Sequence, residues 1–200
     1  MAADFDRIIS RIIALDRYQL SSREYRYVAQ SVASRQGCNM LVFGVGNDSL
    51  LWLLANKQGK TIFLENSEGW AKKIKEKLPE IDIRLVKYNT QRRQWREMLD
   101  GDPAELKLEL PAEVEEKRWD IIFVDGPTGF WDSCPGRMKS IYTASILASG
   151  VEGADIIIHD CDRKVELAYC EHFFSDDMLV NAFDRTRHYR TKSVFRWGKH

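Results

Sequence analysis

The stretch LVFGVGNDSLLW, residues 41–52, is an apolar run that two glycines interrupt. Gly44 and Gly46 end the run, and three small polar residues follow directly at 47–49. Glycines behind a strand permit a tight turn and allow the backbone to approach a ligand closely. The pattern therefore predicts a strand, a ligand-binding turn and the start of a helix. A turn with only a structural role is the alternative.

The composition is that of an ordinary globular protein. Of the 200 residues, 44% are hydrophobic, and 30 basic and 30 acidic residues give no net charge. Such a chain has no overall field that attracts nucleic acid or a membrane surface, so we expect no nucleic-acid partner. No Cys-x-x-Cys pair is present, which argues against a zinc knuckle and a disulfide scaffold. The cysteines are Cys38, Cys134, Cys161 and Cys170.

The N-terminal stretch 1–17 carries a charged residue every few positions. A signal peptide needs an uninterrupted apolar core, and a membrane span needs about 20 mostly apolar residues in a row. The stretch fits neither pattern, so we expect a cytoplasmic protein without a membrane span. A length of 200 residues is typical of one domain that buries a sizeable core, and we treat 1–200 as a single domain.

Two amphipathic helices are predicted ahead of the glycine turn. In the first, apolar residues recur at the spacing of one helix face: Phe5, Ile8, Ile9, Ile12 and Ile13. In the second, Ser21 and Glu24 form the Ser-x-x-Glu pattern of a capping box. We assign the N-terminal helices to 1–36 and an α/β core to 37–200.

The core alternates between strand and helix patterns. Predicted strands lie at 40–43, 61–65, 81–88, 119–125 and 154–160, and predicted helices at 48–57, 67–78, 90–99, 135–149 and 162–174. Several of the strands are almost entirely apolar, as strands buried on both faces are. The alternation predicts right-handed crossovers and a parallel, doubly wound sheet. Residues 101–118 are acidic without clear periodicity and are predicted to form a surface excursion.

Two further strands are predicted near 179–184 and 193–197. Their connection is too short for a helix, so they should form an antiparallel hairpin. The predicted fold class is therefore α/β: a Rossmann-like, seven-stranded and mostly parallel sheet with a C-terminal antiparallel hairpin, preceded by N-terminal helices. This layout is similar to that of the S-adenosylmethionine-dependent methyltransferases.

A carboxylate follows the glycine turn at the spacing of a nucleoside site. Glu65 ends the second predicted strand, 21 residues after Gly44, where a carboxylate accepts hydrogen bonds from ribose hydroxyls. The third glycine of a dinucleotide fingerprint is missing, which disfavours close packing against a pyrophosphate. We therefore predict S-adenosylmethionine, a nucleoside without phosphates, as the cofactor. The predicted cofactor-binding residues are Gly44, Gly46, Asp48, Ser49, Glu65 and Asp125.

Two aspartates end neighbouring strands. Asp125 closes the fourth predicted strand and Asp160 the fifth, and ligands of open α/β sheets bind beyond the carboxyl ends of the strands. Methylation of a hydroxyl requires removal of its proton, which a carboxylate, a histidine or a divalent cation assists. We predict catalytic roles for Asp125, Asp160 and His159, with both aspartates as ligands if a metal takes part. In the alternative, the aspartates cap turns and His159 is a core residue.

Three cations follow these aspartates. Arg137 lies at the start of the helix predicted after Asp125, and Arg163 with Lys164 opens the helix after Asp160. An arginine binds a carboxylate through two parallel hydrogen bonds, and cations at a helix N-terminus oppose the helix dipole. We therefore predict that Arg137, Arg163 and Lys164 bind an acidic acceptor. Salt bridges within the protein are the alternative.

Six blocks of the sequence resemble, in order and with fitting spacing, the polysaccharide-biosynthesis methyltransferase family. The blocks are CNMLVFGVGNDSLLW (38–52), TIFLENSEGW (61–70), VKYNTQ (86–91), WDIIFVDGPTGF (119–130), PGRMKSIYTASILA (135–148) and HDCDRKVE (159–166). The resemblance extends from about Ser21 to near Phe174. Plant members of the family include glucuronoxylan 4-O-methyltransferases, arabinogalactan O-methyltransferases and the irregular-xylem proteins.

The resemblance implies S-adenosylmethionine as the methyl donor and a sugar hydroxyl as the acceptor. In the best-known branch of the family the acceptor is the 4-hydroxyl of glucuronic acid. The family's glycine block corresponds to Gly44 and Gly46, and its acidic strand end to Glu65. Its Asp-Gly/Ala-Pro block corresponds to Asp125, and its His-Asp block to His159 and Asp160.

The sequence also departs from the family. Plant members carry an N-terminal membrane anchor for the Golgi, which the stretch 1–17 does not resemble, and they are longer between the third and fourth strands. We therefore expect a soluble relative from outside the plants that acts on a smaller or different glycoside. Metal-dependent catechol-type O-methyltransferases also pair aspartates at strand ends, but they place Asn where this chain has Cys161. A divalent metal ion thus stays an open alternative.

Two other functions are weighed against a carbohydrate O-methyltransferase. A non-catalytic accessory protein of polysaccharide biosynthesis could keep the fold, although the predicted site residues favour an enzyme. A small-molecule methyltransferase could act on an aromatic hydroxyl, because Phe130 and Trp131 lie near the predicted crevice.

Overall fold

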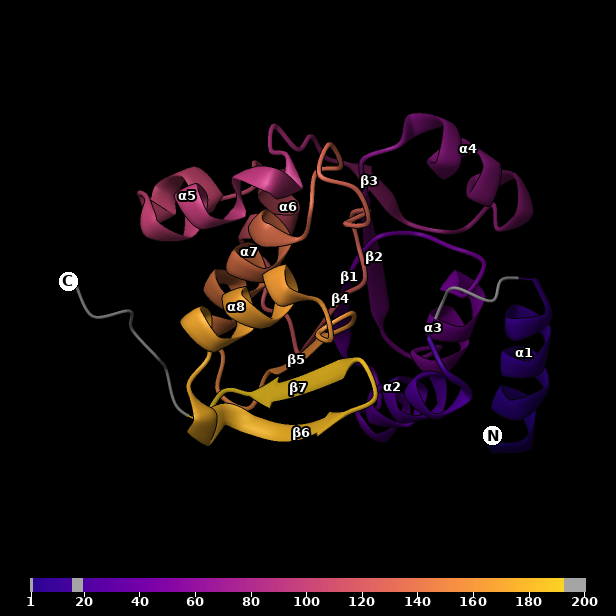
Figure 1. Cartoon of the computed structure of the whole chain (residues 1–200). Coiled ribbons are helices and arrows are strands. Elements are labelled where there is room, and N and C mark those ends of the chain that lie inside the picture. Colours follow the sequence, from indigo (N-terminus) through magenta and orange to yellow (C-terminus); the bar gives the residue numbers. More distant parts are fainter. Residues whose placement is uncertain (1, 16–19, 193–200) are drawn as a thin grey trace.

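The computed structural model describes residues 2–15 and 20–192, in which one sheet lies between two layers of helices (Figure 1). The strands are β1 (Asn39–Phe43), β2 (Lys60–Glu65), β3 (Ile83–Leu85), β4 (Ile121–Val124), β5 (Asp155–Ile158), β6 (Leu179–Phe183) and β7 (Thr186–Arg190). Their order in the sheet is β3-β2-β1-β4-β5-β7-β6. Strands β1 to β5 pair in parallel, whereas β7 pairs antiparallel with β5 and β6. The predicted α/β fold class, with its antiparallel hairpin, is confirmed.

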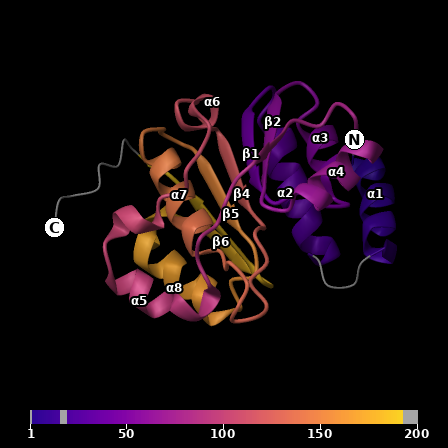
Figure 2. The same ribbon diagram turned by 90° about the horizontal axis from the view of Figure 1, so that it is seen from above.

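Helices cover both faces of the sheet (Figure 2). One layer holds α1 (Ala2–Leu15), α2 (Ser22–Ser34), α3 (Ser49–Ala55) and α4 (Glu68–Lys77); the other holds α5 (Trp95–Asp100), α7 (Met138–Ser149) and α8 (Lys164–Phe173). Leu41 and Phe43 of β1 pack into the α7–α8 layer, and Met40 and Val42 pack into the opposite one. Burial on both faces explains why this strand is apolar throughout.

The N-terminal helices belong to the hydrophobic core. Helix α2 begins with the predicted capping box: Ser21 Oγ accepts the Glu24 N–H at 3.2 Å, and the Glu24 carboxylate accepts the Ser21 N–H at 2.7 Å. Tyr25, Val28 and Val32 of α2 are buried with residues of α1, α3 and the sheet. Among residues 2–15 and 20–192, no helix combines the length and the apolar character that a membrane crossing requires.

The C-terminal hairpin turns earlier than predicted. Its second strand begins at Thr186, because Asp184 adopts a left-handed conformation (φ +48°) that allows a tight turn directly after β6. The predicted strand at 193–197 lies outside the described residues. Similarly, the helix predicted at 135–149 begins only at Met138, since Gly136 before it has a φ of +71°.

The prediction of a surface excursion at 101–118 is wrong in part. The segment contains two short helices, η2 (Pro103–Leu106) and α6 (Ala112–Glu115), and buries Leu106, Leu108 and Val114 in the α7–α8 layer. Leu106 lies in η2, Leu108 between the two helices and Val114 in α6, so together they produce no periodic pattern. Two further short helices, η1 (Arg92–Gln94) and η3 (Asp176–Met178), complete the described elements.

Strands β1 and β4 are neighbours, although β2 and β3 lie between them in the sequence. The chain therefore winds outward in one direction from β1 and in the other direction from β4. Ligands of open α/β sheets bind in the crevice at the carboxyl ends of such neighbouring strands.

Candidate active site

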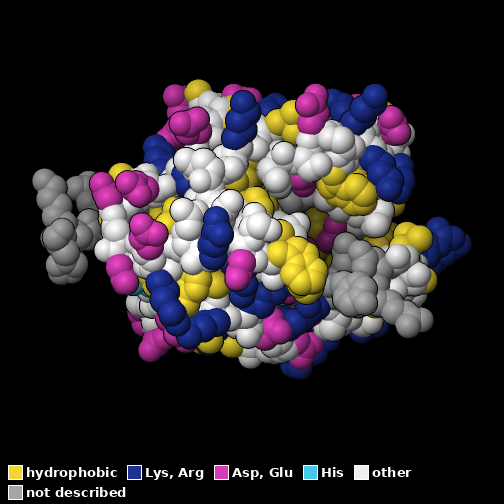
Figure 3. All heavy atoms as spheres, turned by 45° about the horizontal axis from the view of Figure 1, so that its top comes forward, with side chains coloured by type: hydrophobic (Ala, Val, Ile, Leu, Met, Phe, Trp, Pro, Cys, Tyr) yellow, Lys and Arg dark blue, Asp and Glu magenta, His cyan; other side chains and the backbone are white. Residues whose placement is uncertain are grey.

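A cavity of about 390 Å³ opens at the carboxyl ends of β1, β2 and β4, which is a volume typical of small-molecule sites. The residues that line it include five of the predicted cofactor residues: Gly44, Gly46, Asp48, Glu65 and Asp125. In the space-filling view the hollow has hydrophobic side chains on both sides and acidic atoms within it (Figure 3). The strand ends thus create one site, as their topology predicts.

Part of the cavity wall is bare backbone. Gly44 has a φ of +101°, and a Cβ at this position would lie 3.3 Å from the backbone nitrogen of Gly126. A Cβ on Gly126 would in turn lie 2.8 Å from the Cα of Gly44. The turns after β1 and β4 therefore touch through their main chains, and any side chain there would force them apart. This close approach is the physical reason for the first glycine of the opening sequence.

The carboxylate of Glu65 is held at the edge of this cavity by backbone donors. One oxygen accepts the N–H of Val45 at 3.1 Å, and the other accepts the N–H groups of Asn66 at 2.9 Å and Ser67 at 2.7 Å. Three donors fix the carboxylate, which forms no ion pair with a cation among residues 2–15 and 20–192. The unused acceptor positions of its oxygens suit the hydroxyl groups of a ribose.

The two polar residues after the glycine turn differ in role. Ser49 is buried, accepts the N–H of Gly46 at 3.0 Å and does not line the cavity, so the structure gives it a local role in holding the turn. Asp48 lines the cavity and is also buried. Burial, reinforced by the negative charge of Asp125, raises the pKa of Asp48 to about 7.

On the β4 side, Asp125 is hydrogen-bonded to His159. The Nδ1 of His159 lies 2.9 Å from Asp125 Oδ1, and the Asp125 side chain is 22% exposed while the histidine is buried. Burial alone would raise the pKa of Asp125, but the interaction with His159 and the positive charge of Arg137 outweigh it, and the pKa lies below its ordinary value. Asp125 is therefore an ionised, partly accessible carboxylate that faces the cavity.

The expectation that Arg137 is open to an acceptor is wrong for this structure. Its guanidinium is buried and contacts Asp125 Oδ1 at 3.1 Å and Asp160 Oδ2 at 2.8 Å. It also donates to the carbonyl oxygens of Asp125 at 2.8 Å and His159 at 2.9 Å. Arg137 thus connects the two strand ends, and its donors are used within the protein. Nothing in its sequence position distinguishes this role from ligand binding.

Asp160 is surrounded by guanidinium groups. Besides Arg137, it contacts Arg163 at 3.0 Å and Arg185 at 3.2 Å, and its side chain is almost fully buried. Its backbone is left-handed (φ +63°), an uncommon conformation for a residue other than glycine. Asp160 therefore holds the site together and is not itself exposed to the cavity.

The two predicted acceptor cations of α8 lie apart from each other. Arg163 lies between Asp160 and the ring of Phe130, whose centroid is 4.4 Å from the guanidinium carbon. Lys164 is exposed, and its Nζ lies 5.7 Å from the centroid of the Trp95 ring on α5. Lys164 therefore does not join the group of Asp125 and Asp160, contrary to the expectation.

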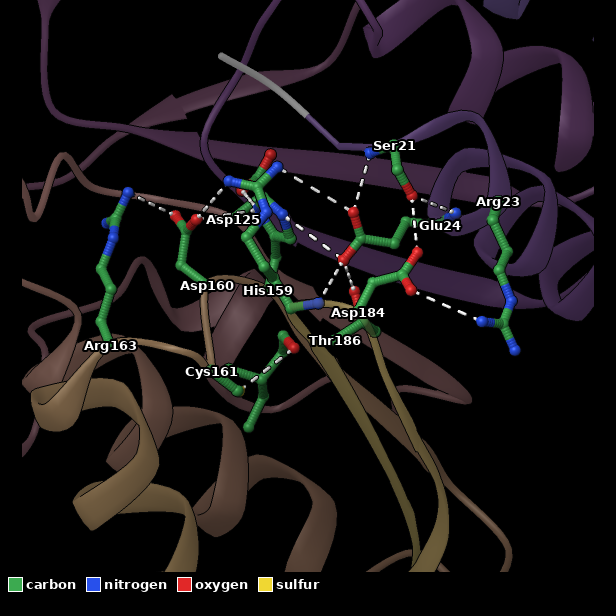
Figure 4. Close-up of polar contacts among 12 residues, drawn as sticks. Ser21, Arg23, Glu24, Asp125, His159, Asp160, Cys161, Arg163, Asp184 and Thr186 are labelled. Atoms are coloured by element: carbon green, nitrogen blue, oxygen red, sulfur yellow. Dashed lines mark hydrogen bonds and ion pairs between the residues drawn. The ribbon is translucent and has the colours of Figure 1, made fainter.

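Glu24 is a site residue that the sequence analysis identified only as a helix cap. It reaches from α2 to the β6–β7 turn, where it accepts the N–H of Arg185 at 3.0 Å and the hydroxyl of Thr186 at 2.8 Å (Figure 4). Its Oε1 also lies 3.7 Å from the buried Nε2 of His159, which has no hydrogen-bond partner in the described part of the chain. Glu24 thus places a second carboxylate beside this imidazole.

A metal ion does not fit the cluster as it is arranged. One donor atom from each of Asp125, His159 and Asp160 lies within 4.8 Å of the others. However, Arg137 contacts both carboxylates, and two further guanidinium groups contact Asp160. A divalent cation at this position would face three like charges, so we assign it no role.

Sequence comparison identifies relatives of the chain. A family model described as IRX15/IRX15L/GXM matches residues 23–105 and 100–189. Glucuronoxylan 4-O-methyltransferase 1 of Arabidopsis thaliana is 34% identical over 189 residues, covering 86% of this chain and 67% of that protein. Glucuronoxylan 4-O-methyltransferase 2 of the same plant is 36% identical over 174 residues, covering 78% of this chain and 60% of that protein. Its arabinogalactan O-methyltransferase 2 is 31% identical over 193 residues, covering 86% of this chain and 66% of that protein. The chain thus spans 60–67% of the length of these relatives.

Structural comparison identifies the same fold in solved structures. One is a putative caffeoyl-CoA O-methyltransferase from Staphylococcus aureus, with a TM-score of 0.57, 14% identity and coverage of 94% of this chain and 92% of that chain. Another is the O-methyltransferase TomG from Streptomyces achromogenes in complex with SAM, with a TM-score of 0.54, 14% identity and coverage of 95% and 89%. At this identity the likeness establishes the fold, which is that of the S-adenosylmethionine-dependent methyltransferases.

Proposed function

Because the chain belongs to the IRX15/IRX15L/GXM family, we propose that it is an S-adenosylmethionine-dependent O-methyltransferase whose acceptor is a carbohydrate hydroxyl. Relatives named for the methylation of glucuronoxylan and of arabinogalactan support a carbohydrate acceptor. The 4-hydroxyl of glucuronic acid is the acceptor that we propose first, since the glucuronoxylan enzymes are named for a 4-O-methyl product.

The cavity fits the proposed cofactor. Its backbone wall at Gly44 and Gly126 allows a flat ligand to approach closely, and Glu65 offers acceptors to ribose hydroxyls. Asp48 lies in the same cavity. When bound, S-adenosylmethionine supplies an electrophilic methyl group. The residues of this chain would then have to orient the acceptor and receive its proton.

Asp125 is the residue that we propose as the general base. It is ionised, partly exposed and on the cavity wall, so its carboxylate can accept the proton of a hydroxyl bound there. His159 and Arg137 orient the carboxylate through Oδ1. In this proposal Asp160 and Glu24 act indirectly, by holding Arg137 and the surroundings of His159.

A single observation carries the proposal: one cavity contains a backbone-bound Glu65 and an ionised Asp125 in a member of this family. The test is incubation of the purified protein with S-adenosylmethionine and glucuronic acid-substituted xylo-oligosaccharides, followed by mass spectrometry. Addition of one methyl group per uronosyl residue is expected. No binding of S-adenosylmethionine in calorimetry, together with no transfer to any glycoside, would instead support the accessory protein.

An aromatic hydroxyl is the second candidate acceptor. Phe130 and Trp131 favour it, because both are exposed on the loop that follows the cavity wall, 56% and 71% respectively. A parallel assay with catechols and hydroxycinnamates distinguishes the two acceptor classes.

A further inference from the structure

The loop between β4 and α7 presents two aromatic side chains to solvent. Gly126, Pro127 and Thr128 line the cavity, and Phe130 and Trp131 follow directly, with 56% and 71% of their surfaces exposed. Large aromatic side chains are strongly stabilised by burial, so two adjacent exposed rings on the loop that continues from the cavity wall indicate a binding surface.

The loop that carries them is anchored on both sides. Arg92 donates its N–H to the carbonyl oxygen of Cys134 at 2.7 Å, and its guanidinium contacts Asp132 at 2.7 Å. The N–H of Gly136 donates to the carbonyl oxygen of Thr128 at 3.2 Å, which closes the loop at its base. The rings therefore stand on a fixed backbone, and a ligand does not have to order the loop when it binds.

The same loop also packs against helix α8. A Cβ on Gly129 would lie 2.8 Å from Glu166 Oε1 and 3.4 Å from Arg163 Nη1. The guanidinium of Arg163 lies over one face of the Phe130 ring and contacts Asp160 Oδ2 at 3.0 Å. The side chain of Arg163 thus connects the aromatic pair to the ion-pair network that orients Asp125.

The chemistry of the pair indicates what it binds. The ring centroids are 6.4 Å apart and the ring planes are tilted by 44°, so a single planar ring cannot stack on both. Thr128, Asp132 and Ser133, which flank the two aromatic residues in the sequence, are exposed as well. A pyranose ring matches this combination, because it offers C–H groups to the negative face of an aromatic ring and hydroxyls at its edge. Two rings are too small for a stable protein interface.

We propose that Phe130 and Trp131 form a binding platform for a second pyranose of an oligosaccharide acceptor, next to the sugar that is methylated. The proposal rests on the carbohydrate methyltransferase function. It implies that the enzyme discriminates by chain length: an oligosaccharide reaches the platform while one of its residues lies at Asp125, and a monosaccharide glycoside does not.

The kinetic test compares kcat/KM for methyl glucuronoside with that for a glucuronic acid-substituted xylohexaose. We expect wild type to prefer the oligosaccharide at least tenfold, Trp131→Ala to lower this ratio about tenfold, and Trp131→Phe to retain most of it. Val180→Ala removes an exposed apolar side chain from β6, at the far edge of the sheet, and should leave the ratio unchanged. An unchanged ratio in Trp131→Ala, or equal use of both acceptors by wild type, overturns the platform.

A binding test separates this proposal from the proposed function. The indole resonance of Trp131 is identified as the one that Trp131→Phe lacks, and it is followed by NMR while the oligosaccharide is added to wild type with S-adenosylhomocysteine. A shift of this resonance supports the platform even if no methyl group is ever transferred. No shift, with efficient methylation of the monosaccharide, overturns the platform and leaves the methyltransferase function intact. A shift with a catechol but not with the oligosaccharide overturns the sugar platform.

Discussion

Glu65 and Asp160 each stand at or just beyond the end of a parallel strand, yet their carboxylates have opposite surroundings. Glu65 accepts three backbone N–H groups at the cavity edge. Asp160 is buried among three guanidinium groups, which come from the residues directly before α7 and α8 and from the β6–β7 turn. The β1–β2 side of the site is therefore built from main-chain donors. The β4–β5 side is built from charged side chains of three separate segments.

This difference predicts different consequences of mutation on the two sides. Loss of the Glu65 carboxylate should mainly weaken ligand binding, because the backbone N–H groups that it accepts can form hydrogen bonds to water instead. Loss of a member of a buried ion-pair network leaves other charges without partners, so it should affect stability as well. Asp125 is the exception on its side, since it faces the cavity.

The largest effect is expected for Asp125→Asn. An amide keeps the shape but does not accept the acceptor's proton, and general-base catalysis contributes about 10²–10⁴-fold. Methyl transfer to the glycoside should fall at least a hundredfold in initial-rate measurements, while the protein stays folded. Glu171→Gln, which neutralises an exposed carboxylate of α8, is the control. Full turnover by Asp125→Asn would exclude the carboxylate as the base.

The second effect concerns the network itself. Arg137→Met removes the cation that contacts both Asp125 and Asp160, and loss of one partner from a buried ion pair costs about 3–5 kcal/mol. Urea unfolding without cofactor should show a loss of this size, whereas the same change at the exposed Arg93 should have little effect. Wild-type stability together with a raised KM for uronosides would return Arg137 to acceptor binding.

The third effect concerns cofactor affinity on the β1–β2 side of the cavity. Glu65→Ala removes the acceptors proposed for the ribose hydroxyls, and hydrogen bonds to a charged group are worth about 1.5–3 kcal/mol each. The Kd for S-adenosylmethionine, measured by calorimetry, should rise at least tenfold. Glu68→Ala changes an exposed carboxylate at the start of α4 and should leave the Kd unchanged. An unaltered Kd in Glu65→Ala would remove Glu65 from the cofactor site.

The smallest effect is a pH dependence of stability. The pKa of Asp48 is about 7 in the folded protein, above its ordinary 3.8. Between these pH values the carboxyl group is therefore ionised in the unfolded chain but still protonated in the folded protein. Ionisation of Asp48 therefore destabilises the fold as the pH rises through this window. Asp48→Asn should melt a few degrees above wild type at pH 8, and the two melting temperatures should converge near pH 4. A constant difference across this range would contradict the raised pKa.

Most of the β1–β2 side could be predicted from the sequence, because its parts are close together in the chain. The glycine turn, the carboxylate 21 residues later and the apolar strands between them form a local pattern with one common structural solution. Asp125 was predicted for a similar reason, since a strand end in a parallel sheet always lies at the ligand-binding edge. The family blocks added the acceptor class and supported the predicted donor.

The β4–β5 side could be predicted only in part. Sequence reasoning placed Arg137 and Lys164 beside an acceptor, but the structure pairs Arg137 with two aspartates and places Lys164 against Trp95. Glu24 carried the signal of a helix cap, and its contact with Thr186 joins residues 162 positions apart. No local pattern distinguishes a cation that meets a ligand from one that meets a buried carboxylate.

The sequence by itself determined the order of strands and helices, the backbone turn at Gly44 and the edge of the sheet where the site lies. These features follow from periodicity and from backbone conformations that few residues adopt, and both are properties of neighbouring residues. Only the tertiary structure decided which charges are paired, which carboxylate stays accessible and that Phe130 and Trp131 stay exposed. Coulomb energy and burial depend on distances in space, and the chain sets those distances only when it has folded.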